Sequence, residues 1–190
     1  MKILRPSDTE VSEYVYVMTS IPVVGRRMSE GERLGYQLAA KFVQQAGPEP
    51  LDLCELHRLM YPGDVMAGQF RKGAVLEMSA AECRPKAVPR SATIADLVGL
   101  FRQGYEQALV SDVASATRCK PRTLAWYLAA FGRCVRPFAR GSRFVFFLIE
   151  NHLLQMYGER WRSKLVPQRA FRHFRENAFN KMCTSQLVYA

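Results

Sequence analysis

The stretch FGRCVRPFARGSRFVFFLIENHLLQMYG, residues 131–158, decides the fold. Its second half is apolar on every side, which is typical of a helix buried in the centre of a domain. We expect this helix over residues 142–157, because Gly158 suits the position just beyond a helix C-terminus. A loop over residues 136–141 precedes it. The apolar run Phe144–Ile149 is too short to span a bilayer.

The segments before this stretch predict four more helices and one strand. Apolar residues at helical spacing predict a helix after Pro121 and a longer one over residues 94–109. Ser29 and Glu32 have the spacing of a capping box, which predicts that another helix begins there. The apolar spacing of that helix is supplied by Leu34, Leu38 and Phe42. The two remaining elements are a short helix over residues 50–61 and a short strand over residues 74–78.

The composition is that of a globular protein with an excess of positive charge. The 190 residues suffice for one domain with its own core. Apolar residues make up 48% and charged residues 23%, which excludes a disordered tail, a collagen-like rod and a coiled coil. The formal net charge of +10 favours polyanionic partners or a phosphate-bearing ligand, although a solvated basic face is the commoner explanation of such a charge.

The cysteines and the N-terminal residues indicate the compartment. The five cysteines are widely spaced and form no CxxC pair, so we predict neither a disulfide framework nor a zinc site. Reduced thiols are typical of a cytoplasmic protein. Residues 1–13 lack the apolar core of a secretory signal. We therefore expect a cytoplasmic protein, or one delivered into a host cytoplasm, without a membrane span and without a metal.

Two segments resemble stretches typical of the Fic (Fido-superfamily) proteins. Residues 53–78, LCELHRLMYPGDVMAGQFRKGAVLEM, are similar to the family's helix ending in LHxxL, which continues through aGxfR into a β-hairpin called the flap. The matching residues are His57, Gly68, Phe70 and Arg71. Residues 131–158 are similar to the family's HPFxxGNGR loop and the buried helix after it. The resemblance covers about residues 30–158 and implies a mostly α, Fic-type helical bundle with a small β-hairpin flap.

The resemblance also implies a division of the chain and a place for a partner. We expect an irregular N-terminal segment over 1–29, a Fic-like core over 30–158 and a basic helical extension over 159–190. In the family, the flap holds a target segment by strand addition. Here the flap residues would be Lys72, Gly73, Ala74, Val75 and Leu76.

In active Fic proteins the loop transfers AMP from ATP to a protein hydroxyl group. A histidine is the general base, an acidic residue holds magnesium, and glycine N–H groups and a final arginine bind the phosphates. In this sequence Arg136 stands where the base belongs, and a guanidinium cannot accept a proton. Arg140 stands where the metal ligand belongs and would repel a cation. One residue of the GNGR portion is missing.

The loop retains residues that could bind an anion without a metal. They are Arg140, Gly141, Ser142 and Arg143. Three arginines within the eight residues 136–143 predict a bound phosphate group, from ATP or another ligand, unless Glu55, Glu77 or Glu150 neutralises them. We expect Phe138 to anchor the loop in the core.

No other residue is an obvious replacement for the missing base. None of the histidines His57, His152 and His173 lies in the loop, and we interpret His57 as a packing residue of its helix. Cys134 lies on an apolar helix, where a cysteine usually packs.

Three functions follow from these observations. The leading hypothesis is a catalytically inactive Fic-like pseudoenzyme that binds a partner or a phosphate-bearing ligand, or acts as a scaffold. One alternative is a working transferase that modifies protein hydroxyls from ATP or a related donor with a non-standard site. The other is nucleic-acid binding by the basic tail, where aromatic and cationic residues alternate. The tail residues concerned are Arg160, Trp161, Arg162, Lys164, Arg169, Phe171, Arg172, Phe174 and Arg175.

Overall fold

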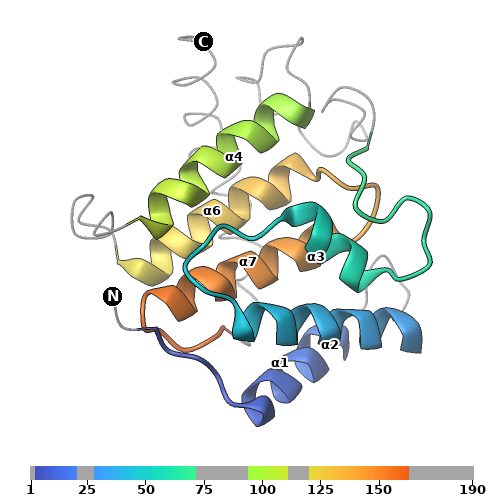
Figure 1. Ribbon diagram of the computed structural model, residues 1–190, viewed down its shortest axis with the longest axis horizontal. Coiled ribbons are helices and arrows are strands. Elements are labelled where there is room, and N and C mark those ends of the chain that lie inside the picture. The colour runs from blue at the N-terminus through green and yellow to red at the C-terminus, as the bar shows by residue number, and fades with distance from the viewer. Residues whose placement is uncertain (1–2, 21–27, 72–93, 111–119, 163–190) are drawn as a thin grey trace.

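The computed structural model describes residues 3–20, 28–71, 94–110 and 120–162. Figure 1 shows that these residues form a bundle of α-helices. The helices are α1 (Asp8–Ser20), α2 (Glu30–Gln45), α3 (Leu53–Met60), α4 (Ile94–Leu109), α6 (Pro121–Val135) and α7 (Ser142–Met156). The prediction of a mostly α fold is confirmed. The described ranges contain no strand, and the predicted flap, residues 72–76, lies outside them.

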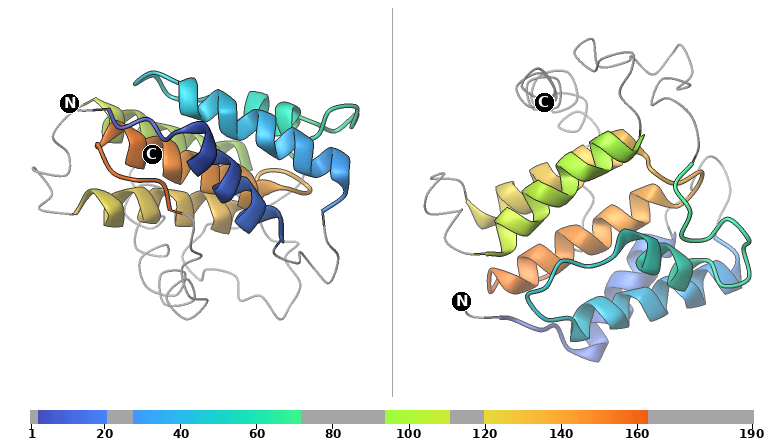
Figure 2. Two further views of the ribbon diagram at one scale, coloured as in Figure 1. Left: turned by 90° about the horizontal axis from the view of Figure 1, so that it is seen from below. Right: turned by 45° about the horizontal axis from the view of Figure 1, so that its top comes forward.

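Helix α7 is the centre of the bundle, as its sequence predicts. It packs against α2, α3, α4 and α6, and Figures 1 and 2 show it between α6 and α2. Every residue of α7 except Arg143 is buried. Its polar side chains are paired: His152 Nε2–H donates to the Gly47 carbonyl over 2.8 Å, and the Tyr105 hydroxyl donates to His152 Nδ1 over 2.6 Å. A buried helix of this kind needs such partners because unpaired polar groups are costly in a core.

Helix α2 buries a different face from the one that its large apolar residues mark. Its capping box is confirmed, because the Ser29 N–H donates to the Glu32 carboxylate and the Glu32 N–H donates to the Ser29 hydroxyl. Leu34, Leu38 and Phe42, however, are 53%, 56% and 36% exposed. The buried residues are Gly35, Tyr36, Ala39, Ala40 and Val43. A Cβ at Gly35 would collide with the Met60 carbonyl of α3, so small residues are required where the two helices meet.

The expectation of an irregular segment over residues 1–29 is wrong for Asp8–Ser20, which form α1. A second capping box begins this helix. The Ser7 N–H donates to Glu10 Oε2 over 2.8 Å, and the Glu10 N–H donates to Ser7 Oγ over 3.2 Å. Val11, Tyr14, Val15 and Met18 then face the core. The Ser-x-x-Glu pattern at residues 7–10 is the signal that predicts this helix.

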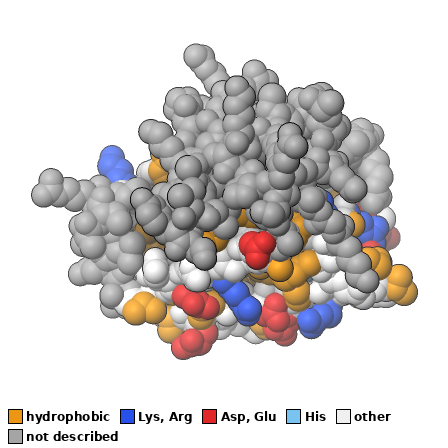
Figure 3. Space-filling view, turned by 90° about the horizontal axis from the view of Figure 1, so that it is seen from above, with side chains coloured by type: hydrophobic (Ala, Val, Ile, Leu, Met, Phe, Trp, Pro, Cys, Tyr) orange, Lys and Arg blue, Asp and Glu red, His pale blue; other side chains and the backbone are white. Residues whose placement is uncertain are grey.

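The surface of the described residues mixes charges of both signs. In Figure 3 acidic and basic side chains lie beside hydrophobic ones along the edge of the molecule that the described residues form. Among the described residues, no helix combines the length and the hydropathy that crossing a bilayer requires.

Candidate functional site

Two left-handed residues shape the loop over residues 136–141. Helix α6 ends at Val135, and its C-cap Arg136 has φ 49°. Gly141, with φ 74°, is the N-cap of α7. The left-handed region is accessible to glycine and costly for an arginine, so surrounding contacts must hold Arg136 there. One such contact is the Arg136 N–H, which donates to the Gly132 carbonyl over 3.1 Å.

Arg71 joins the loop that follows α3 to the 136–141 loop. Its backbone N–H donates to the Pro137 carbonyl over 2.8 Å, and its Nε donates to the Arg136 carbonyl over 2.7 Å. Its Nη2 also donates to the Val135 carbonyl over 3.4 Å. A guanidinium at the carbonyl end of α6 satisfies groups that the helix leaves unpaired. Residues 61–71 and 136–141 therefore lie side by side, and we call them the loop pair.

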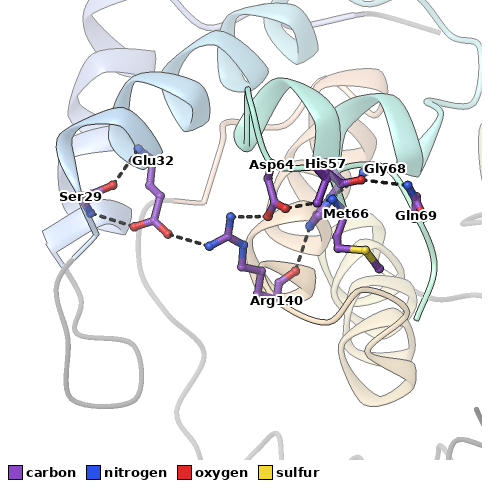
Figure 4. Close-up of polar contacts among 9 residues, drawn as sticks. Ser29, Glu32, His57, Asp64, Met66, Gly68, Gln69 and Arg140 are labelled. Carbon is purple, nitrogen blue, oxygen red and sulfur yellow. Dashed lines mark hydrogen bonds and ion pairs between the residues drawn. The ribbon is translucent and has the colours of Figure 1, made fainter. Parts of the chain in front are cut away.

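His57 of α3 is the centre of the loop pair (Figure 4). Its Nε2–H donates to the Arg140 carbonyl over 3.0 Å, and its Nδ1 accepts the Gly68 N–H over 2.9 Å. The ring stacks on Phe138 with 4.1 Å between ring centroids and 8° between the planes. Only the neutral ring has the acceptor that Gly68 uses. Burial lowers the pKa of His57 and favours this neutral form. The prediction that His57 is a packing residue is confirmed.

Phe138 and Ser142 hold the loop against the core. Phe138 is buried, as predicted, and also contacts the Phe70 ring at 5.3 Å between centroids. The Ser142 hydroxyl accepts the Phe138 N–H over 3.0 Å and donates to the Phe138 carbonyl over 3.1 Å. The polar group of Ser142 is thus used inside the protein.

Arg140 is neutralised by two carboxylates that the sequence does not mark as its partners. Its guanidinium forms an ion pair with Asp64 and another with Glu32, the latter over 3.9 Å (Figure 4). The same guanidinium lies over the Tyr61 ring, 4.6 Å from its centroid. Asp64 and Glu32 therefore balance this charge, whereas Glu150 pairs with Arg162; Glu77 lies outside the described residues. The signals in the sequence were the turn Pro62-Gly63-Asp64 and the capping-box glutamate, neither of which indicates its distant partner.

The side of Gly141 where a Cβ would stand is filled by Tyr61. A Cβ built on Gly141 collides with the Tyr61 ring and hydroxyl. Glycine is needed here for packing as well as for its backbone conformation. Of the four residues predicted to bind phosphate, Arg140, Gly141 and Ser142 are thus engaged within the protein.

Arg136 and Arg143 both present their side chains to solvent. The Arg143 guanidinium lies over the Phe147 ring at 5.3 Å from the centroid, and Arg133 lies over the same ring at 4.8 Å. Two cations on one ring add favourable contacts with its π face but repel each other. Cys134 is buried, as predicted for a packing residue.

Of the predicted nucleic-acid tail, the structure describes Arg160, which is exposed, and Trp161 and Arg162, which pack onto the helices. Trp161 packs edge-on against Tyr14, with 5.2 Å between ring centroids, and its Nε1–H donates to Gln155 Oε1 over 3.3 Å. Arg162 forms a 2.9 Å ion pair with buried Glu150. These side chains pack onto α1 and α7. The tail residues from 163 onward lie outside the described residues.

No protein-family model matches the chain, and no curated protein is similar to it. The Fic resemblance therefore rests on the quoted residues alone. In the described ranges, no group of three histidine, cysteine or acidic residues has the arrangement of a metal site.

We predict that acid destabilises the protein through its buried histidines. Burial lowers the pKa of His57 and of His152 below the ordinary value of about 6.5, so the unfolded chain binds more protons. Their stabilising contribution is present above pH 6.5 and is lost as pH falls toward the folded pKa, by at most about 1.4 kcal/mol per pH unit for each histidine. Denaturant unfolding between pH 5 and 7.5 measures this slope.

The variant His57→Gln is the control for that experiment. It removes the titrating group from the folded and unfolded states alike, so its stability should fall less steeply with acid than that of the wild type. An equal slope for the two proteins would show that His57 does not titrate as the geometry requires.

We predict that Arg140→Ala lowers Tm by about 2–4 °C, because it removes the contact with Tyr61 and leaves Asp64 and Glu32 without their cation. High salt should shrink the difference between variant and wild type. Thermal melts at low and high ionic strength measure it. A variant as stable as the wild type would mean that repulsion among Arg136, Arg140 and Arg143 outweighs these contacts.

Proposed function

We propose that this protein is a catalytically inactive Fic-like domain that acts by binding a protein partner or as a scaffold. The observation that carries the proposal is the state of Arg140. It stands at the position of the family's metal ligand, and it forms ion pairs with Asp64 and Glu32. A cation paired with two carboxylates fastens the loop to α2 and to the loop after α3, where an acidic residue would have offered a charge to magnesium.

The order of elements supports the Fic-like part of the proposal. Helix α6, the 136–141 loop and the buried helix α7 follow each other as the resemblance implies. The residues that lead into the expected flap lie beside the loop, because Arg71 bonds to Pro137.

The chemistry of the loop pair supports the inactive part. General base catalysis needs a group that accepts a proton from the target hydroxyl. Arg136 cannot accept one, and both ring nitrogens of His57 are engaged with backbone groups. The Tyr61 ring packs against Gly141. In active family members, the glycine-rich turn at this position would hold a phosphate beside that glycine.

We predict that the purified protein transfers little or no AMP. The test incubates it with labelled ATP, magnesium or manganese and a cell lysate, with an active AMP-transferase in parallel. Because the loop has no base and no metal ligand, label should stay at background. Label on a target protein, lost in Arg143→Ala, would contradict the proposal and favour a transferase with a non-standard site.

The same protein tests whether the loop is a phosphate site. With Arg140 already neutralised, ATP or inorganic phosphate should leave Tm unchanged, because a ligand raises Tm only by binding the folded state. A rise in Tm that Arg143→Ala abolishes would assign the function to a phosphate-bearing ligand instead of a protein partner.

A further inference from the structure

Helix α2 carries a row of large apolar side chains on the face that it turns away from the bundle. Its other face packs against α1, α3 and α7, and Figures 1 and 2 show α2 at the edge of the described part of the molecule. The row consists of Leu34, Leu38 and Phe42, which are 53%, 56% and 36% exposed. Single exposed apolar residues are common on proteins, but three in one row form a patch.

Helix α4 shows what a solvated helix face of this chain looks like. Its second half exposes polar and charged side chains, as is usual for a helix face in water. These residues are Arg102, Gln103, Glu106 and Gln107. The exposed row on α2 therefore has the composition of a contact surface instead of a solvated one.

The spacing of the row fits a second helix that has the same row. Leu34, Leu38 and Phe42 are four positions apart, so they form one of the ridges that run along a helix surface. In the commonest class of helix packing, both helices contribute a ridge with this spacing. A second copy of this chain supplies an identical ridge. With a two-fold axis near Gln37, the apolar side chains of each copy would fall midway between those of the other along the helix.

Two charged residues make the contact between two copies complementary. Glu30 and Lys41 are eleven positions apart, about three turns, so they lie on the same flank at opposite ends of the row. Lys41 is exposed and has no ion pair within the described residues. The Glu30 side chain is 80% exposed and lies 3.8 Å from Arg33 of its own helix. The same two-fold axis would bring Lys41 of each copy to within about 4.5 Å of the level of Glu30 of the other.

We propose that the row of Leu34, Leu38 and Phe42 is the contact surface of a symmetric dimer, in which α2 packs antiparallel against α2 of a second copy. Burial of the two apolar rows supplies the favourable free energy, and the pairs of Lys41 with Glu30 fix the antiparallel direction. A stable interface of standard size buries about 800 Å² on each partner, and one helix face covers less. The dimer is therefore reversible, and its population depends on protein concentration. This inference stands apart from the proposed Fic-like function, since it uses neither the 136–141 loop nor the expected flap.

The test is analytical ultracentrifugation of the full-length protein from micromolar to millimolar concentration. The wild type should change from monomer to dimer over this range without larger species, because a two-fold contact is closed. The double variant Leu34→Ser with Leu38→Ser should weaken the dimer about tenfold or more. A wild type that stays monomeric, or a double variant that dimerises as well as the wild type, would overturn the proposal.

A matched double variant separates this row from general apolar association. Val65→Ser with Met66→Ser removes two apolar side chains, 85% and 47% exposed, from the loop after α3. It should preserve the dimer Kd within about twofold, because that loop takes no part in the proposed contact. Melting curves of dilute protein verify that each variant is folded. Equal losses in the two double variants would overturn the proposal.

Charge reversal tests the antiparallel arrangement. Glu30→Lys and Lys41→Glu should each weaken the dimer about threefold or more, because like charges would then meet across the two-fold axis. The variant that carries both changes should regain the wild-type Kd within about twofold, since opposite charges meet again. A combined variant that dimerises no better than either single variant would overturn the antiparallel packing of α2 on α2.

Discussion

Phe138→Ala should destabilise the protein by about 3–5 kcal/mol, the usual cost of truncating a buried aromatic side chain. Phe138 is almost fully buried, stacks on His57 and contacts Phe70, so its removal opens a cavity between the two loops. The cavity cannot close easily, because Ser142 holds the backbone of residue 138 by two hydrogen bonds. Denaturant unfolding of the variant and the wild type measures the difference in free energy of unfolding.

Phe42→Ala is the matched control for this experiment. It deletes the same side chain from the exposed side of α2, where Ala also has the higher helix propensity. Its effect should stay within about 1 kcal/mol. If the two variants unfolded at the same denaturant concentration, Phe138 would not be the anchor of the loop.

Gly141→Ala should be the second large effect, a loss of about 2–4 kcal/mol from two causes. The residue has φ 74°, which a Cβ disfavours, and its Cβ would also collide with Tyr61. Relief of the collision would displace the Tyr61 ring, on which the Arg140 guanidinium lies. The free energy of unfolding of the variant is the measurement.

Two other glycines separate the causes. Gly63→Ala has a similar φ of 82° with open space around it, so it should cost about 1 kcal/mol from backbone strain alone. Gly99→Ala, inside α4 and also in open space, should stabilise the protein by about 0.5–1 kcal/mol. A loss at Gly141 no greater than that at Gly63 would show that Tyr61 yields without cost.

Local patterns predicted the helices because their determinants lie within a few residues. The capping box at Ser29, the Pro121 start of α6 and the apolar run of α7 each act over one or two turns. The helix expected over residues 50–61 is shorter, Leu53–Met60, because the Asp52 side chain caps it by accepting the Cys54 N–H. Helix α1 was missed although Ser7 and Glu10 form the same kind of box.

Part of the candidate site follows from the sequence alone, and the rest follows only from the tertiary structure. The residue types at 136–143 alone determined that the loop lacks a proton acceptor, because the protonation of a guanidinium does not depend on the fold. Only the tertiary structure decided which acids neutralise Arg140: Asp64 and Glu32 come from two other elements, and nothing local indicates that they meet. The tertiary structure also decided which face of α2 is buried. Because α3 approaches α2 at Gly35, the side chains of Leu34, Leu38 and Phe42 face solvent. A sequence specifies spacing along one helix, whereas the face that is buried depends on what packs against it.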